Sequence, residues 1–172
     1  MKEIINFFNH PFFVIIGGIS TAIAVVIFFY GIYSVFRGIV PVWIRLGKSL
    51  HNRKIAIYAE NDFESLKSLL SDSGIFKTKN ITQITKDSIA KGEKFTMMLV
   101  NYPEFNDDIK PILKHKRDSD SLIVYAPQTG GRIEQKLMDK INENRNSIVV
   151  NFRGRLLNDI MTSMITTTYE KK

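Results

Sequence analysis

The stretch from Phe12 to Phe36 contains 25 residues and not one charged side chain. An α-helix rises about 1.5 Å per residue, so this stretch is long enough to cross a hydrocarbon core of roughly 30 Å. A cleaved signal peptide has a shorter apolar run of about 7–15 residues, and a soluble core helix interrupts its apolar run with a polar face. The sequence therefore predicts a membrane-spanning helix over residues 12–36.

The charges beside this stretch predict its orientation. Lys2, Glu3 and His10 precede it, whereas residues 37–54 carry five Lys or Arg and no acid. Lys and Arg next to a span stay on the cytoplasmic side. We therefore expect a single-pass protein of the cell inner membrane with its N-terminus outside. The expected order is a short extracytoplasmic segment (1–11), the span (12–36), a basic juxtamembrane segment (37–54) and a cytoplasmic ligand-binding domain (55–172).

The formal net charge of +7 comes mostly from the juxtamembrane segment. Residues 55–172 carry 18 Lys or Arg against 16 Asp or Glu. A collar of positive charge at a membrane sets topology and contacts anionic headgroups, so long nucleic acid is not an expected partner. The chain has no cysteine, which excludes disulfides and Cys-ligated zinc and is typical of a reducing cytoplasm.

Short β-rich runs alternate with helical periodicity after the juxtamembrane segment. Strands are predicted over residues 54–59, 80–84, 95–101, 122–126 and 148–152. Helices are predicted over residues 62–70, 86–90, 103–116, 131–144 and 155–168. Near-continuous apolar strands between amphipathic helices are typical of a parallel sheet covered on both faces. The predicted fold is α/β, a five-stranded parallel, flavodoxin- or Rossmann-like doubly wound domain of strand order 2-1-3-4-5.

In such open sheets, ligands bind outside the carboxyl ends of the strands. Amides, a hydroxyl, glycines and arginines follow the predicted strands at this edge. The candidate ligand-binding residues are Asn61, Thr129, Gly130, Gly131, Arg132, Asn151, Arg153 and Arg155.

The turn at residues 128–132 is the better of these signals. Two glycines let the backbone approach a ligand, and we expect Gly131 to open a helix whose N-terminal amides favour an anion. Arg132 could then hold a phosphate. The lysine and spacing of a Walker loop are missing. The alternative is an ordinary strand-to-helix turn with a solvated arginine.

Two arginines around a glycine follow the fifth predicted strand. Arg153 and Arg155 stand at a helix start, where positive charge opposes the macrodipole, so an anionic partner would explain them. A surface turn is the alternative. The basic run at residues 114–117 lies at the opposite end of the sheet, and we interpret it as a solvated helix end, with a membrane or nucleic-acid contact as the alternative.

The sequence contains no set of residues typical of a catalytic site, and no catalytic residue, metal site or cofactor is predicted. Asn101 and Asn151 stand where a receiver-type phosphorylation site would need an aspartate and a lysine. A lone acid at the strand ends could support sugar–nitrogen bond cleavage in a nucleotide. The candidates for it are Glu60, Glu104 and Glu134, each of which is otherwise a solvated surface acid.

Small residues share one face of the predicted span. Gly17, Ser20, Thr21 and Ala24 follow helical spacing, which permits close helix packing. In a bundle of several chains, Ser20, Thr21 and Ser34 would line a pore. A lone anchor is the alternative.

The whole layout resembles the small membrane effectors of nucleotide-signalled bacterial anti-phage defence, including membrane-anchored sensors of CRISPR-linked oligoadenylates. At residue level the resemblance rests on the turns at residues 129–132 and 153–155. It implies a homo-oligomer, with a tetramer favoured, that binds a nucleotide or short oligonucleotide in the cytoplasm. The expected function is therefore an ion channel or pore controlled by that ligand. The alternatives are a membrane-tethered nucleotide- or NAD-cleaving enzyme and a membrane-anchored adaptor.

Overall fold

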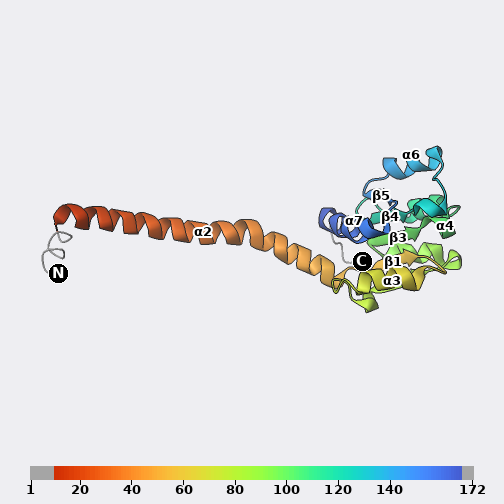
Figure 1. The fold of residues 1–172 in the computed structure, drawn as a ribbon, viewed down its shortest axis with the longest axis horizontal. Coiled ribbons are helices and arrows are strands. Elements are labelled where there is room, and N and C mark those ends of the chain that lie inside the picture. Colours follow the sequence, from red (N-terminus) through yellow and green to blue (C-terminus); the bar gives the residue numbers. More distant parts are fainter. Residues whose placement is uncertain (1–9, 168–172) are drawn as a thin grey trace. The chain divides into compact units, whose positions relative to one another are not determined.

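The structure is a computed structural model that describes residues 10–167 (Figure 1). Its chain contacts divide it into two compact units, Met1–Arg45 and Leu46–Lys172. The first unit carries most of a long helix, and the second unit carries the sheet and the remaining helices.

The long helix α2 runs over Pro11–Asn52 without interruption. Its portion Pro11–Ile44 is long and apolar enough to cross a membrane, and no part of its most apolar window is buried within the chain. Pro41 lies inside the helix and removes one backbone donor, but the helix continues past it to Asn52. The segment that follows the predicted span is therefore helical over most of its length.

The sheet has five parallel strands in the order β2-β1-β3-β4-β5, as predicted. The strands are β1 (Ile55–Tyr58), β2 (Ile81–Ile84), β3 (Met97–Asn101), β4 (Ser121–Tyr125) and β5 (Ser147–Val150). In the register, Ile55 of β1 lies opposite Ile81 of β2 and Met97 of β3. The α/β doubly wound fold predicted from the sequence is confirmed.

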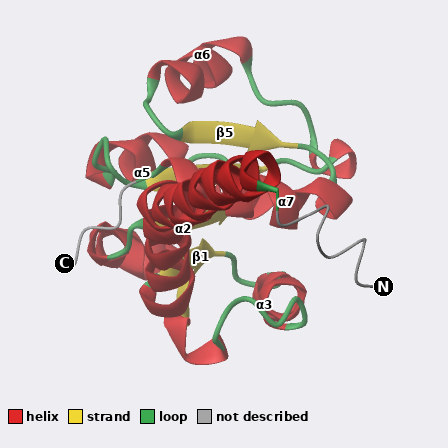
Figure 2. Cartoon of the chain, turned by 90° about the vertical axis from the view of Figure 1, so that its left-hand side faces the viewer, coloured by secondary structure: helices red, strands yellow, loops and turns green. Residues whose placement is uncertain are grey.

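Two apolar cores cover the two faces of the sheet, with helices around the strands (Figure 2). One core takes side chains from α4 (Tyr102–Phe105), α5 (Ile109–His115) and α6 (Gln135–Glu143). The other takes side chains from α3 (Phe63–Ser71) and α7 (Arg153–Thr166). Along β1, Ala56 and Tyr58 belong to the first core, and Ile55 and Ile57 belong to the second, which is the period of two expected of a strand buried on both faces.

The chain changes face between β1 and β3. The helix after β1 packs on one face, and the helices after β3 pack on the other. The carboxyl ends of β1 and β3 are therefore the topological switch point of the sheet.

Several helix predictions need correction. The predicted helix 103–116 is split into α4 and α5, and the predicted helix 86–90 is the 3₁₀ segment η2 (Lys86–Lys94). The predicted helix 131–144 is wrong in its first turn. There, Gln128–Gly130 forms the 3₁₀ turn η3 and α6 begins only at Gln135, because Gly131 has φ 92° and ψ 164°, which no helix contains. A further 3₁₀ turn, η1 (Thr78–Asn80), precedes β2.

Arg53 lies inside the domain, although its position predicts a charge of the membrane collar. Only 1% of its surface is exposed. Its Nη1 donates to Thr167 Oγ1 at 2.7 Å, and its Nη2 donates to Thr167 O at 3.3 Å. A buried guanidinium thus binds the C-terminal end of α7, where the helix leaves carbonyl groups without helical partners.

Candidate functional site

A pocket of about 350 Å³ opens at the carboxyl ends of β4 and β5. Sites for small ligands commonly have volumes of about 300–1,000 Å³. The pocket brings together three of the predicted ligand-binding residues, Gly131, Arg132 and Asn151. The other lining residues are Ala126, Gln128, Ile133, Gln135 and Met138. We call this space the β4–β5 pocket.

The chemistry of the β4–β5 pocket is amide-rich, with one charge. Among the described residues that line it, Arg132 carries the charge, and the amides belong to Gln128, Gln135 and Asn151. Ile133 and Met138 supply apolar surface. This set can bind a small anion-bearing molecule, because a guanidinium attracts phosphate or carboxylate and side-chain amides both donate and accept hydrogen bonds.

The two glycines shape the wall of the pocket. A Cβ atom on Gly130 would stand 2.4 Å from Cγ of Pro103, so a larger residue would push η3 away from the turn after β3. Gly131 has φ +92°, which favours glycine. The expectation that Gly131 opens a helix at the site is wrong, since Glu134 stands at the N-cap of α6. Thr129 and Gly130 belong to η3 and are absent from the lining of the pocket.

Arg153 and Arg155 begin α7 but serve different contacts. Nη2 of Arg153 donates to both Ser65 O and Ser65 Oγ at 2.8 Å, which joins α7 to α3. Arg155 lies 3.8 Å from Asp159 and lines a smaller pocket of about 130 Å³ beside β5. Asn151 lines both pockets. The predicted basic turn therefore places one arginine next to the β4–β5 pocket and turns the other towards α3.

The switch point is occupied by the chain itself. The carboxylate of Glu104 accepts hydrogen bonds from three consecutive backbone amides, those of Glu60, Asn61 and Asp62. The amide nitrogens of Asn61 and Asp62 each lie 3.1 Å from Oε1. Asn61, a predicted ligand-binding residue, thus has its backbone donor engaged within the protein.

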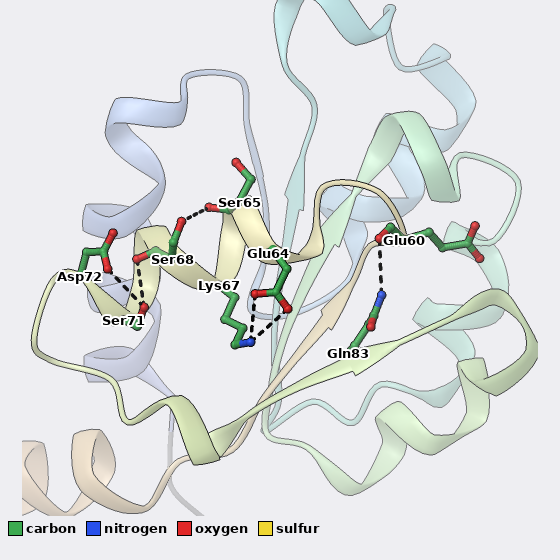
Figure 3. Close-up of polar contacts among 8 residues, drawn as sticks. All are labelled: Glu60, Glu64, Ser65, Lys67, Ser68, Ser71, Asp72 and Gln83. Carbon is green, nitrogen blue, oxygen red and sulfur yellow. Dashed lines mark hydrogen bonds and ion pairs between the residues drawn. The ribbon is translucent and has the colours of Figure 1, made fainter.

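The three acids considered for catalysis, Glu60, Glu104 and Glu134, have different surroundings in the structure. Glu104 holds the loop after β1, and Glu134 is exposed at the start of α6. Glu60 is exposed, and its side chain extends away from α3 (Figure 3). Its carbonyl oxygen lies 3.5 Å from Nε2 of Gln83, which also donates to Ala59 O at 2.9 Å. In the part of the chain that the structure describes, Glu134 lines a pocket between α4, α5 and α6, and neither Glu60 nor Glu104 is among the residues that line the β4–β5 pocket.

A larger pocket of about 560 Å³ lies between α4, α5 and α6. Its charged lining residues are of both signs, namely Asp107, Lys110, Glu134, Lys136 and Lys140. Three lysines against two carboxylates leave this lining with a net charge of +1, which equals that of the β4–β5 pocket, so charge does not distinguish the two pockets. The β4–β5 pocket differs in its place, at the carboxyl ends of the strands.

The basic run at residues 114–117 lies just before β4, at the amino end of the strands. Lys116 is half-buried, and its Nζ donates to the backbone oxygens of Arg117 and Arg145. Burial lowers the pKa of Lys116, and the charges of Asp120 and Asp118 partly offset this effect. This lysine joins two loops, so the prediction of a wholly solvated helix end is wrong at Lys116.

Within residues 10–167, no group of His, Asp and Glu side chains is arranged to hold a metal ion. The role of Glu104 was missed by sequence reasoning, because residues 60–62 and 104 meet only through the strand order. Its sequence signal is a glutamate just after the strand that neighbours β1. Comparisons of the chain with protein-family models, with curated proteins and with solved structures find no match.

Proposed function

We propose that this chain is a non-enzymatic membrane effector whose α/β domain binds a nucleotide or short oligonucleotide in the β4–β5 pocket. The observation that carries the proposal is the meeting of Arg132 and Asn151 in one pocket at the carboxyl ends of β4 and β5. In doubly wound sheets this edge is where ligands bind.

In this proposal each wall of the pocket has its own role. The guanidinium of Arg132 holds a phosphate group, while the amides of Gln128, Gln135 and Asn151 bind polar edges of a base or sugar. Arg155, next to Asn151 on the neighbouring pocket, binds a further phosphate of a longer ligand. Met138 gives apolar contact to the base.

The membrane part of the proposal rests on α2. A single helix forms no pore, so several copies, with four favoured, assemble through the face of Gly17, Ser20, Thr21 and Ala24. Thr21 Oγ1 donates to Gly17 O at 2.8 Å, which satisfies the hydroxyl within its own helix and leaves a small surface for a neighbour. Ser20, Thr21 and Ser34 line the pore in the assembled state.

The placement in the cell is also part of the proposal. The basic residues that follow the apolar stretch favour an inner-membrane protein with its α/β domain in the cytoplasm. There, a ligand opens or closes the pore only through different affinities for two assembled states. A role in nucleotide-signalled anti-phage defence follows from the resemblance in architecture.

The test begins with the full chain purified in detergent. Small molecules released from it are identified by mass spectrometry, and nucleotides and short oligoadenylates are screened by thermal shift. A stabilising ligand should lose about tenfold or more in affinity in Arg132→Ala, because a charge-assisted contact is removed. The matched control is Arg117→Ala, an exposed arginine before β4 at the other end of the sheet. Equal binding by wild type and both variants would refute the site, and conversion of the added nucleotide would refute the non-enzymatic function.

A further inference from the structure

Three successive backbone N–H groups after β1 point at one carboxylate. Those of Asn61 and Asp62 donate to Glu104 Oε1, each at 3.1 Å, and that of Glu60 donates to Oε2. Successive amides that converge in this way form an anion-binding concavity. We call residues 60–62 the switch-point loop.

The switch-point loop lies where the fold favours an anion. It follows β1 at the point where the topology of the sheet reverses, and it leads into α3, whose N-terminus carries partial positive charge. In this chain the anion is an internal one, since Glu104 comes from α4 after β3. The loop therefore has the geometry of an anion site whose occupant is part of the protein.

A second observation at the same place is a buried amide. Asn101 ends β3 with 0% of its surface exposed. Its Nδ2 donates to Asp62 Oδ2 at 2.9 Å, and its Oδ1 has no hydrogen-bond partner within residues 10–167. A buried polar atom without a partner costs free energy, so Asn101 keeps an unused acceptor next to the switch-point loop. An amide oxygen does not bind an anion, and the donors that face an anion at this place are the three backbone amides of the loop.

We infer that Glu104 is a specificity-determining residue, whose carboxylate fills the switch-point loop and keeps phosphate out of it. An external phosphate must compete with a carboxylate that is tethered next to the amides and is therefore present at high effective concentration. Exclusion of phosphate from this loop directs an anionic ligand to the β4–β5 pocket. That last consequence rests on the proposed function, whereas the exclusion itself does not.

Removal of the carboxylate converts the loop into a phosphate site. The substitution Glu104→Ala leaves three amides facing solvent with no anion, and inorganic phosphate can accept from all three. Glu104→Gln is the matched variant, because it keeps the side-chain length and one acceptor oxygen but removes the charge. Glu134→Ala controls for the loss of one exposed acid elsewhere on the domain.

The experiment is a titration of the full chain in detergent with inorganic phosphate, against chloride at equal ionic strength, with thermal unfolding as the readout. Glu104→Ala should gain a saturable, phosphate-specific rise in Tm, with an apparent affinity about tenfold or more above that of wild type, Glu104→Gln and Glu134→Ala. A well-folded Glu104→Ala protein without this response would overturn the inference, as would an equal response in wild type. If the alanine variant shows no cooperative unfolding, Glu104→Ser is measured in the same way. Failure of both variants to fold would assign Glu104 a purely structural role and also contradict the inference.

A further variant separates this inference from the proposed function. The phosphate response of Glu104→Ala should persist when Arg132→Ala is added, because Arg132 lines the other pocket. Loss of the response in the double variant would place the phosphate in the β4–β5 pocket and overturn the assignment to the switch-point loop. Absence of any nucleotide binding by wild type would refute the proposed function and leave the phosphate result unaffected.

Discussion

Arg153 donates from a single nitrogen, Nη2, to both the carbonyl oxygen and the hydroxyl of Ser65, each at 2.8 Å. Residue 153 is the first of α7, and residue 65 lies in α3, so the contact joins the two helices that cover one face of the sheet. The close-up in Figure 3 shows Ser65 on α3 together with its neighbour Ser68, whose hydroxyl also donates to the carbonyl oxygen of residue 65. Arg153 thus has a hydrogen-bond partner on α3. The ion-pair partner of Arg155, Asp159, lies on its own helix α7.

The two arginines should therefore respond differently to substitution. Arg153→Ala should lower the free energy of unfolding by about 0.5–1.5 kcal/mol, the usual net contribution of a hydrogen bond, and should leave ligand affinity nearly unchanged. Arg155→Ala should leave stability within about 0.5 kcal/mol, since Arg155 is exposed and lies 3.8 Å from Asp159, and should weaken binding of a phosphate-bearing ligand. Urea unfolding and ligand thermal shift measure the two effects, and a reversed pattern would contradict these roles.

Arg53 should behave as a core residue and not as a membrane-surface charge. Arg53→Ala should destabilise the domain by about 2–4 kcal/mol, because the carbonyl and hydroxyl groups at the end of α7 lose a buried charged donor. The control is Lys54→Ala, which removes an exposed positive charge one residue later and should change stability by less than about 0.5 kcal/mol. Chemical denaturation of the two variants distinguishes them. Equal, small effects would mean that Arg53 belongs to the collar.

Gly92 should tolerate no side chain while Tyr58 stands beside it. A Cβ atom on Gly92 would stand 1.6 Å from the hydroxyl oxygen of Tyr58 and 2.6 Å from Cζ. Gly92→Ala should therefore cost about 1–3 kcal/mol through overpacking. Tyr58→Phe removes the closer clash, so the double variant should recover part of the loss in a double-mutant cycle. Strict additivity of the two substitutions would show that the two residues do not collide.

Alkaline pH should reveal the burial of Tyr58. Burial raises the pKa of its phenol above the ordinary value of about 10. The unfolded chain then loses this proton at lower pH than the folded domain. The contribution of the neutral phenol to the free energy of unfolding is therefore fully present below about pH 10 and is lost as the pH rises above 10. Tyr58→Phe should remove this component. The difference in unfolding free energy between wild type and Tyr58→Phe should therefore move against wild type above about pH 10. A pH-independent difference would contradict a buried, neutral phenol.

The sheet could be predicted from the sequence because the signal for a strand lies in a few consecutive residues. Strands β1, β3 and β4 are short and mostly apolar runs, and residues such as Ala56 and Ile57 face opposite cores, so a parallel sheet covered on both faces explains the pattern. The start of α6 could not be predicted in the same way. Gly131 fits either a helix start or an extended turn, and only the structure shows its φ of +92°, which excludes the helix start.

The site was predictable only in part for a related reason. Residues that follow β4 and β5 meet at one edge once the strand order is known, and this brings Arg132 and Asn151 together as expected. The direction of a long side chain depends on partners far away in the chain. Arg153 contacts Ser65, Arg53 contacts Thr167, and Glu104 contacts the switch-point loop. The partners in each pair lie far apart in the sequence, and for Glu104 the sequence signal has meaning only once the strand order is known.

The measurement that tests the central claim most directly is ligand binding to the full chain in detergent, compared among wild type, Arg132→Ala and Arg117→Ala. Nucleotides and short oligoadenylates serve as ligands, and calorimetry gives the affinity. A ligand in the β4–β5 pocket predicts binding by wild type and Arg117→Ala, with a loss of about tenfold or more in Arg132→Ala. Undiminished binding by Arg132→Ala, or no binding by wild type, would contradict the account of the β4–β5 pocket as a nucleotide site.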